Sequence, residues 1–174
     1  MNNISKPTND KELEQITQKI LTELHCPLKH AAKNLVFGKG NPNAPILFIG
    51  EAPGAKEDEQ GIPFVGRAGK ELDKLLQRID LTIDDVYIAN ILKYRPPQNR
   101  DPKKEEIMDH TPYLIEQIKI IKPKIIATLG NYSTKFILSQ CNIENMKKVQ
   151  GIAEIHGQKF NIKLDNIEFL LITI

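Results

Sequence analysis

The sequence lacks tryptophan, has only two cysteines among its 174 residues, and contains no apolar run of membrane-spanning length. A membrane-spanning helix needs about 20 consecutive apolar residues, so we expect no membrane partner. The cysteines, Cys26 and Cys141, lie far apart in a chain without a recognisable signal peptide. This favours reduced thiols and a cytoplasmic protein over a fold built on disulfides.

An excess of charge of one sign is also absent. The 24 lysines and arginines nearly balance the 22 acids, giving a net charge of +2, so any surface for nucleic acid has to be a local patch. Apolar residues make up 40% of the chain, which is enough for the core of one domain. We therefore expect a flexible tail at residues 1–8 and a single, monomeric domain at residues 9–174.

What the chain does contain is one distinctive stretch, residues 46–69, in which a core strand ends in a long loop. Ile46 to Ile49 form a short β-branched and aromatic run that is typical of a buried strand. The loop then turns repeatedly at Gly50, Pro53, Gly54, Gly61, Pro63, Gly66 and Gly69. Open α/β sheets bind ligands at the carboxyl ends of their strands, so this loop is the predicted site.

The loop contains groups that could face a ligand. Gly50 and Gly54 have no Cβ, so a ligand can approach the main chain around Glu51 and Ala52. Phe64 lies between turn residues, where it is either a plug in the core or a ring presented to a flat base.

The rest of the chain alternates strands and helices. Buried strands are predicted at residues 86–92 and 124–129, and amphipathic helices at 10–24, 69–80, 102–121 and 132–138, with a break in the third helix at Thr111–Pro112. Further short strands are predicted at residues 152–155, 159–163 and 167–174. This alternation predicts a parallel sheet with right-handed crossovers.

A basic loop follows the predicted strand at residues 86–92. Asn90 lies near the end of that strand, and Lys93, Arg95 and Arg100 crowd the loop behind it. Such a loop is either a solvated surface or a contact for DNA phosphates, and the residues alone leave both readings open.

Several ordered blocks of the sequence are similar to one known family. In order and spacing they resemble the family-4 uracil-DNA glycosylases, and together they cover most of the chain from about Cys26 onward. The blocks are Phe37-Gly-Lys-Gly-Asn-Pro42, Gly50-Glu-Ala-Pro-Gly54, Glu57-Asp58, Gly61-Ile-Pro-Phe-Val-Gly-Arg-Ala-Gly69, Tyr87-Ile-Ala-Asn-Ile-Leu-Lys93, Arg95-Pro-Pro-Gln-Asn-Arg100 and Lys124-Ile-Ile-Ala-Thr-Leu-Gly130.

The resemblance implies a fold and an activity. The implied fold is a three-layer α/β/α sandwich around a mostly parallel sheet. The implied activity is hydrolysis of the N-glycosidic bond of uracil in DNA, a step of base excision repair in which the base leaves the stack. By resemblance uracil stacks on Phe64 and its edge is read by the Asn90 amide, whose donor and acceptor match N3–H and O4 of uracil and mismatch cytosine.

The resemblance also suggests roles for other residues. It implies base binding at Ala52 and Gly54, and it places an alanine, Ala52, where related families have an aspartate that orients the attacking water. The candidate catalytic residues are Glu51, Glu57 and Asn99, and the candidate DNA-binding residues are Lys93, Arg95 and Arg100.

One departure from the family concerns its cofactor. The family binds a 4Fe-4S cluster through four cysteines, but only Cys26 is retained, and the other positions fall on Glu23, Tyr94 and, approximately, His110. Tyrosine and glutamate are poor replacements for thiolates around iron and sulfide. We therefore expect no cluster, and we interpret Cys141 as a small buried hydrophobe.

A second departure is at the end of the sequence. In the family, a strand resembling residues 169–174 leads into a second signature whose histidine contacts uracil, whereas this sequence stops at Ile174. We therefore expect a domain truncated at its carboxyl end and impaired excision, because losing a stabiliser of the leaving group costs about a hundredfold in rate. The alternative is a non-catalytic module that binds nucleic acid or bases.

The topology gives one further expectation. Parallel strands joined by a crossover helix present their carboxyl ends at the same edge of a sheet. The residues expected to converge there are Glu51, Ala52, Gly54, Phe64 and Asn90, with Lys93, Arg95 and Arg100 on the rim.

Overall fold

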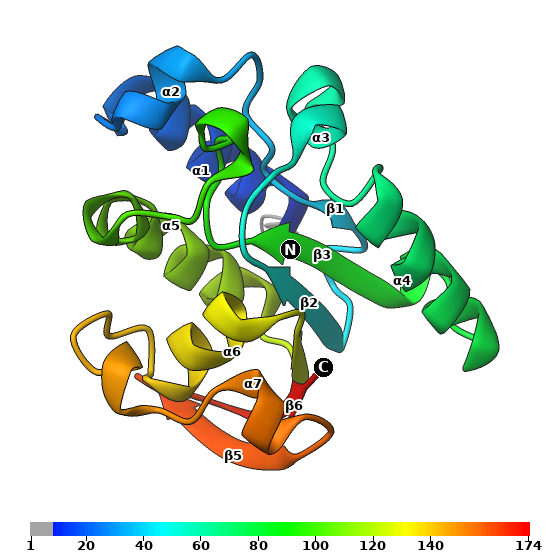
Figure 1. Cartoon of the computed structure of the whole chain (residues 1–174). Helices are drawn as coiled ribbons and strands as arrows, with labels where there is room; N and C mark the ends of the chain where they lie inside the picture. The colour runs from blue at the N-terminus through cyan, green and yellow to red at the C-terminus, as the bar shows by residue number, and fades with distance from the viewer. Residues whose placement is uncertain (1–8) are drawn as a thin grey trace, which may run out of the picture.

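The structure is a computed structural model that describes residues 9–174, in which a central sheet lies between helices (Figure 1). The tail expected at residues 1–8 lies outside the described residues. The strands are β1 (Lys39–Gly40), β2 (Ile46–Gly50), β3 (Val86–Asn90), β4 (Ile125–Thr128), β5 (Lys159–Leu164) and β6 (Ile167–Thr173). The α-helices are α1 (Asn9–Glu23), α2 (Pro27–Ala31), α3 (Ala55–Gln60), α4 (Arg67–Arg78), α5 (Lys104–Ile121), α6 (Asn131–Leu138) and α7 (Ile152–Ile155). Three short 3-10 helices, η1 (Ile83–Asp85), η2 (Pro97–Asn99) and η3 (Met146–Lys148), complete the described part.

The sheet is mostly parallel. The strand order among the described residues is β1-β3-β2-β4-β6-β5. Strands β3, β2, β4 and β6 run parallel, whereas β1 and β5 pair antiparallel at the two edges. The carboxyl ends of the four parallel strands therefore meet at one edge of the sheet, and the predicted α/β fold is confirmed.

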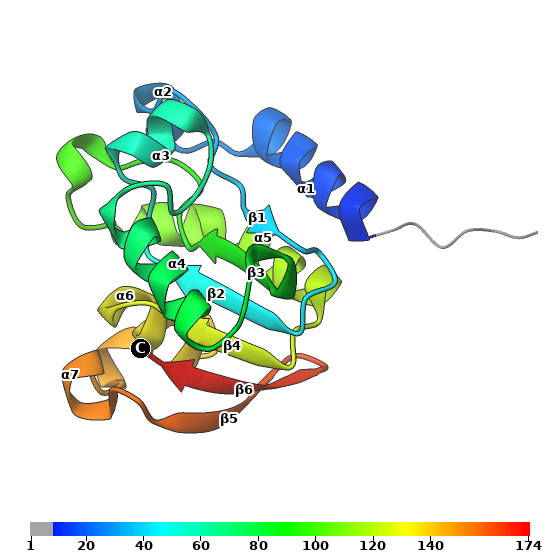
Figure 2. The ribbon, with the colours of Figure 1, turned by 90° about the vertical axis from the view of Figure 1, so that its right-hand side faces the viewer.

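The alternation of side chains along β2 explains why helices cover both faces. Successive residues of a strand point to opposite faces. Leu47 and Ile49 belong to a core shared with α1, α5 and α6, whereas Phe48 packs in a second core with Leu72 and Leu76 of α4. Accordingly, α1, α5 and α6 lie on one side of the sheet in Figure 1 and α4 lies on the other, in front of the sheet in Figure 2.

The predicted break at Thr111–Pro112 is wrong, because α5 runs without interruption from Lys104 to Ile121. Pro112 has no N–H for the carbonyl of Met108, one turn earlier. Both residues are exposed, so water can hydrogen-bond that carbonyl and the helix continues.

The strand predicted at residues 152–155 is also wrong, because this segment is the one-turn helix α7. Ile152 and Ile155 are three residues apart, a spacing that fits one face of a helix. The side chain of Asn131 accepts a hydrogen bond from the Ile152 N–H (3.1 Å), and Ile155 is buried. The tertiary contact with α6 decides the conformation.

The long loop after β2 contains a helix, α3, that the sequence did not reveal. It begins after Gly54 and ends at Gly61, whose φ of 70° is in the left-handed region. Asp58 is 4% exposed, and its carboxylate accepts hydrogen bonds from the N–H groups of Lys33 (2.8 Å) and Asn34 (3.2 Å). One acid of the loop thus anchors α3 to the segment behind α2.

Among residues 9–174, no helix is both long enough and apolar enough to cross a bilayer.

Candidate active site

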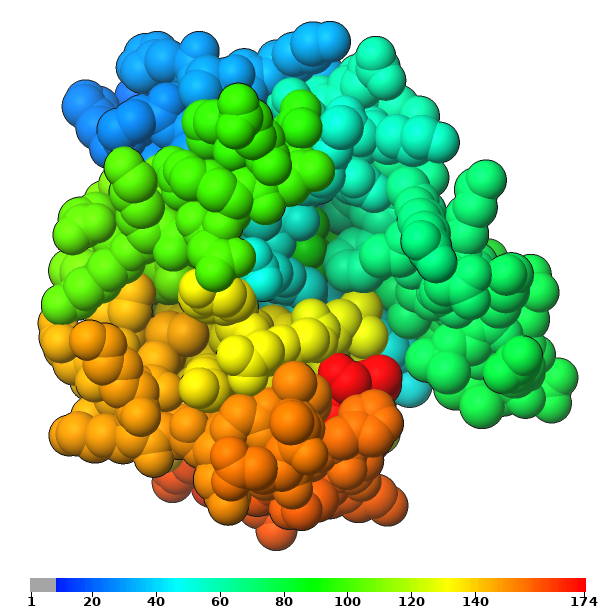
Figure 3. All heavy atoms as spheres, viewed as in Figure 1, coloured from blue at the N-terminus to red at the C-terminus, as the bar shows by residue number. Residues whose placement is uncertain are grey.

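A cavity opens at the carboxyl edge of the parallel strands. Its volume is about 530 Å³, within the range of small-molecule sites. Its walls come from the turn after β2, the segment between α3 and α4, the end of β3, the η2 loop and the turn after β4. In Figure 3 the surface is hollowed where the cyan, green and yellow segments of the chain meet. We call this cavity the base pocket.

The structure brings most of the predicted site residues together here. The predicted residues that line the base pocket are Glu51, Ala52, Gly54, Glu57, Phe64, Asn90, Asn99 and Arg100. Lys93, Arg95 and Cys26 are not part of its lining.

Gly50 forms the floor between the two side chains that were predicted to contact a base. A Cβ added at Gly50 would lie 2.5 Å from Asn90 Oδ1 and 2.7 Å from Phe64 Cζ. Both side chains therefore converge on the same face of Gly50. Only glycine leaves room for this approach.

The main chain at Phe64 is strained and held from two sides. Its φ of 53° lies in the left-handed region, which is costly for a bulky residue and is typical of functional sites. Lys39 Nζ donates a hydrogen bond to the Phe64 carbonyl (2.9 Å). Glu57 Oε1 accepts hydrogen bonds from the N–H groups of Val65 (2.9 Å) and Gly66 (2.7 Å). Glu57 thus holds the turn that carries the Phe64 ring.

Asn90 ends β3 directly beside the end of β2. It pairs in register with Gly50. The next two N–H groups also donate hydrogen bonds to this turn: Ile91 N–H to the Gly50 carbonyl and Leu92 N–H to the Glu51 carbonyl, each at 3.0 Å. The Asn90 side chain is 2% exposed, and within residues 9–174 its Oδ1 atom has no hydrogen-bond partner. A buried oxygen without a partner at the wall of a cavity can accept a hydrogen bond from a ligand.

Glu51 is the acid whose electrostatics stand out in the base pocket. Burial raises the pKa of this half-buried carboxyl, and the nearby charge of Asp101 raises it further. Asp101 is exposed and accepts a hydrogen bond from the Tyr132 hydroxyl (3.1 Å). A carboxyl with a raised pKa inside a cleft is a candidate for proton transfer.

The rim prediction for Lys93 is wrong. Lys93 is 0% exposed, and its Nζ donates to the Asn90 carbonyl (2.8 Å) and to Gln117 Oε1 (2.5 Å). A fully buried amine cannot contact a DNA phosphate at the surface. Arg95 is half-buried, and its Nε donates to Asn99 Oδ1 (2.7 Å), so one polar atom of Asn99 is already used.

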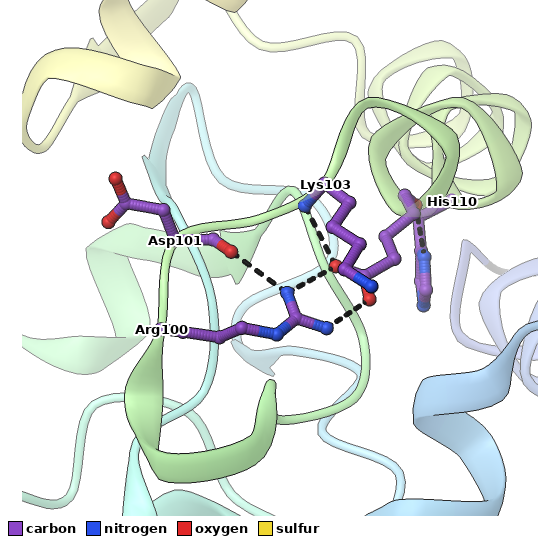
Figure 4. Close-up of polar contacts among 5 residues, drawn as sticks. Arg100, Asp101, Lys103 and His110 are labelled. Carbon is purple, nitrogen blue, oxygen red and sulfur yellow. Dashed lines mark hydrogen bonds and ion pairs between the residues drawn. The ribbon is translucent and has the colours of Figure 1, made fainter.

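Arg100 lines the base pocket but is paired on its other side. Its Nη1 and Nη2 donate to the carboxylate of Glu106 at 2.9 and 2.5 Å, and Nη1 also donates to the Asp101 carbonyl (2.9 Å), as Figure 4 shows. The same carboxylate accepts from the Lys103 N–H (2.8 Å). The pair holds the pKa of Glu106 below its usual value. Arg100 therefore braces its loop against α5.

The residues at the family's cluster positions do not fit an iron–sulfur cluster. Burial raises the pKa of the Cys26 thiol to about 11, and Cys26 is the one cysteine among the four family positions. Tyr94 and His110 pack edge to face, with ring centroids 6.2 Å apart. Glu23 lies exposed at the end of α1. No group of three or more His, Cys, Asp or Glu side chains that could hold a metal occurs within residues 9–174.

The base pocket also includes residues that sequence reasoning missed. Arg67 is exposed on its lining at the first turn of α4, and Gly130 lies at the start of α6. Arg67 stands in the block Gly61-Ile-Pro-Phe-Val-Gly-Arg-Ala-Gly69. Its position in the predicted ligand-binding loop could therefore have identified it as a pocket residue. No histidine is among the described residues that line the pocket.

Comparison with known proteins supports the same family. Residues 37–171 match the uracil DNA glycosylase superfamily. The chain is 48% identical over 142 residues to the type-4 uracil-DNA glycosylase of Sulfurisphaera tokodaii, which covers 80% of this chain and 64% of that protein. It is 41% identical over 160 residues to the type-4 enzyme of Saccharolobus solfataricus, covering 91% and 72%. The corresponding protein of Archaeoglobus fulgidus is 43% identical over 143 residues, covering 81% and 72%. The chain thus spans 64% to 72% of the length of these relatives.

Proposed function

Because this chain belongs to the uracil-DNA glycosylase superfamily, and within it to the type-4 family, we propose that it recognises uracil in DNA and hydrolyses the bond between the base and deoxyribose. The observation that carries this proposal is the convergence of Phe64 and Asn90 on Gly50. A ring, an amide with a free oxygen and a floor without a side chain are the groups that a flat, flipped-out base requires.

Base selection is assigned to Asn90. Its unpartnered Oδ1 can accept from N3–H of uracil, and its Nδ2 can donate to O4. Cytosine presents an acceptor at N3 and donors at N4, so both contacts are mismatched. Phe64 supplies the stacking surface, which is worth about 1–3 kcal/mol per base.

The hydrolytic step is assigned to Glu51. The oxygen of a water molecule bonds to C1′ while the C1′–N1 bond breaks, and the electron pair leaves with the uracil anion. Glu51 accepts the water proton, a role that suits a carboxylate whose pKa burial has raised. Glu57 already accepts two main-chain hydrogen bonds at the Phe64 turn, so we assign it to positioning.

Contacts with the DNA backbone are assigned to Arg67 and Arg100. Arg67 is exposed on the pocket lining, and the Arg100 side chain, although paired with Glu106, is 34% exposed on the same lining. Phosphate contacts orient the strand, while the pocket reads the base. Asn99 lines the same wall. Its Oδ1 already accepts a hydrogen bond from Arg95, so its Nδ2 is the atom that can donate a hydrogen bond to the DNA.

Turnover by these 174 residues is expected to be slow, because no histidine lies among the described residues of the pocket lining. The same observation favours a second candidate function, selective binding of uracil-containing DNA without catalysis. Under the first proposal the parent chain releases uracil slowly from a single-stranded oligonucleotide with one uracil.

The test compares the parent chain with Asn90→Ala. Alkaline strand cleavage of the product reports excision, and fluorescence anisotropy of the same oligonucleotide reports binding. We expect Asn90→Ala to abolish both excision and the preference for uracil over cytosine. Asn161→Ala, an exposed asparagine on β5, is the matched control and should behave as the parent. Excision that is unaffected by Asn90→Ala would contradict the site, and binding without excision would favour the second function.

The chain is further proposed to hold no 4Fe-4S cluster and to act as a monomer with reduced thiols in the cytoplasm. The donor set around Cys26 supports the first point, since a cubane cluster needs soft thiolate ligands. Iron analysis and visible absorbance after anaerobic purification test it. A content near four irons per chain, the count of the cluster type, would contradict it.

A further inference from the structure

Lys93 is one of the largest fully buried side chains among the described residues. An amine taken out of water needs hydrogen-bond partners. Lys93 Nζ has two, the carbonyl of Asn90 (2.8 Å) and Oε1 of Gln117 on α5 (2.5 Å). It also lies 5.8 Å from the centre of the Phe37 ring. One of its two partners is therefore the main chain of the residue assigned to base selection.

The Asn90 carbonyl lies where the sheet offers little support. The neighbouring strand β1 pairs with Tyr87 and Ile88 but does not extend along β3 as far as Asn90. On the opposite side of this segment, the N–H groups of Ile91 and Leu92 donate hydrogen bonds to the end of β2 and the turn after it. Lys93 thus supplies the hydrogen bond that a longer β1 would supply in a wider sheet.

The hydrogen bonds continue from Lys93 into the rest of the fold. Gln117 Nε2 donates to the Phe37 carbonyl (3.2 Å), so one amide joins α5, Lys93 and the segment before β1. The titratable groups that face this network are His110 and Tyr87; burial lowers the pKa of His110, and the nearby Lys93 charge lowers it further. No carboxylate is a hydrogen-bond partner of Lys93 within the described residues.

Two other roles for this lysine are inconsistent with its position. A phosphate contact needs an exposed amine, and Lys93 is fully buried. Attack on the sugar or base needs an amine in the base pocket, and Lys93 is not part of its lining. Burial lowers the pKa of Lys93 to about 7, but the amine has no path to a substrate in this structure.

We propose that Lys93 is a positioning residue: its amine fixes the main chain at Asn90, so that the Asn90 amide faces Phe64 across Gly50 and discriminates uracil from cytosine. Lys93 acts on base selection without touching the base. This inference rests on the proposed function, and it adds the Lys93–Gln117 pair to the parts on which selection depends.

The first test observes Asn90 directly and needs no activity. The side-chain amide signals of Asn90 are identified in a ¹⁵N-labelled sample by their loss in Asn90→Ala. Lys93→Met keeps the length of the side chain and removes the donor, and we expect it to shift these signals. Lys29→Met is the matched control, because Lys29 Nζ also donates to main-chain carbonyls (Ile20, Leu21 and Leu24), but away from the pocket. Unmoved Asn90 signals in folded Lys93→Met would overturn the inference.

If Lys93→Met fails to fold, the double variant Lys93→Met/Gln117→Leu takes its place. It replaces both buried polar partners by apolar side chains of similar size, which removes the stranded Gln117 amide. The expected shift of the Asn90 signals and the overturning result are the same.

The second test is a double-mutant cycle on binding. The affinity ratio between oligonucleotides with one uracil and one cytosine is measured for the parent, Lys93→Met, Asn90→Ala and the combined variant. We expect Lys93→Met to lower the ratio about tenfold in the parent and to have no further effect when Asn90 is alanine. If Lys93→Met leaves the uracil-to-cytosine affinity ratio unchanged, the inference about Lys93 is overturned and the proposed function is not. A parent chain without any preference would overturn the proposed function, and the Asn90 signals would still decide the positioning by Lys93.

Discussion

Two buried side-chain atoms in the described part of the chain have no hydrogen-bond partner, and their surroundings differ. Asn90 lines the base pocket, whereas His110 on α5 lies outside that lining and packs against the Tyr94 ring. Asn90 is 2% exposed and His110 is 0% exposed, so burial alone does not distinguish them. What differs is the presence of a cavity beside the atom.

This difference separates a binding group from a packing group. A buried polar atom without a partner costs about 1–3 kcal/mol. At Asn90 a ligand can recover that cost by donating a hydrogen bond into the cavity. At His110 no cavity gives a ligand access. Burial lowers the pKa of this ring to about 4, so the ring is neutral near pH 7. The base pocket is therefore open to recognition, and the region around His110, Tyr94 and Cys26, which we call the packed region, supports the fold.

The largest effect should come from closing the base pocket. Gly50→Ala places a Cβ 2.5 Å from Asn90 Oδ1 and 2.7 Å from Phe64 Cζ, so these side chains have to move apart. We expect the affinity for a uracil-containing oligonucleotide to fall about a hundredfold or more, because small displacements at a site have effects of this size. Asn90 would then resemble His110, a buried group that no ligand reaches.

The control for this variant is Gly151→Ala. The atoms nearest its Cβ would be in the side chains of Asn131 and Lys135, outside the pocket lining. Anisotropy titrations of both variants decide the point. Affinity kept in Gly50→Ala would show that the base does not bind between Phe64 and Asn90.

The next effect concerns the packed region and appears in the pH dependence of stability. The pKa of His110 is about 4 in the folded chain and about 6.5 in an unfolded one. Between these values the unfolded chain binds a proton that the folded chain does not, so stability falls as the pH falls from about 6.5 to about 4. The loss should approach 3 kcal/mol, at about 1.4 kcal/mol per pH unit.

Urea unfolding at several pH values measures this slope. His110→Phe keeps a flat ring against Tyr94 and removes the titrating group, so its stability should fall less over the same range. His156→Gln changes an exposed histidine and serves as the control. Equal slopes in the parent and His110→Phe would mean that another group carries the pH dependence.

A smaller effect is expected where the pocket is braced from outside. Glu57→Ala removes the acceptor of the Val65 and Gly66 N–H groups and loosens the strained Phe64 turn. We expect the affinity for uracil-containing DNA to fall about tenfold, the size of one charge-assisted hydrogen bond. Glu57→Gln retains an oxygen that can accept and should lose less.

Glu59→Ala, an exposed neighbour on α3, is the matched control for the Glu57 variants. If Glu57→Ala abolished excision but left binding intact, Glu57 would act in the chemical step, as the family resemblance suggested.

The sequence could predict the base pocket because its determinants are local. Gly50, Glu51 and Ala52 follow a recognisable strand in one block, and parallel strands bring Asn90 to the same edge. The sequence also predicted in part that the packed region is not a cofactor site, because Tyr94 stands where the family has a cysteine. Short blocks with strong turn chemistry are what sequence patterns describe best.

The fate of Lys93 could not be predicted, because nothing local distinguishes a buried lysine from an exposed one. Its partner Gln117 lies on α5, 24 residues further along the chain. Helix α7 was missed for a similar reason, since contact with Asn131 of α6 decides its conformation. In both cases tertiary contacts override the local pattern.

The smallest effect should come from the retained cysteine. Cys26 is 2% exposed, burial raises its thiol pKa to about 11, and no other cysteine stands at a family cluster position. We expect Cys26→Ala to lower the free energy of unfolding by only about 1 kcal/mol, the central value for point substitutions, and to leave iron content and uracil binding unchanged. Cys141→Ala, at a half-buried cysteine that no family cluster position matches, should give an effect of similar size. If Cys26 were a cluster ligand, its removal would instead release iron and unfold the chain in urea titrations where Cys141→Ala stays folded. That result would break the comparison, because the packed region would then be a cofactor site like those of the family.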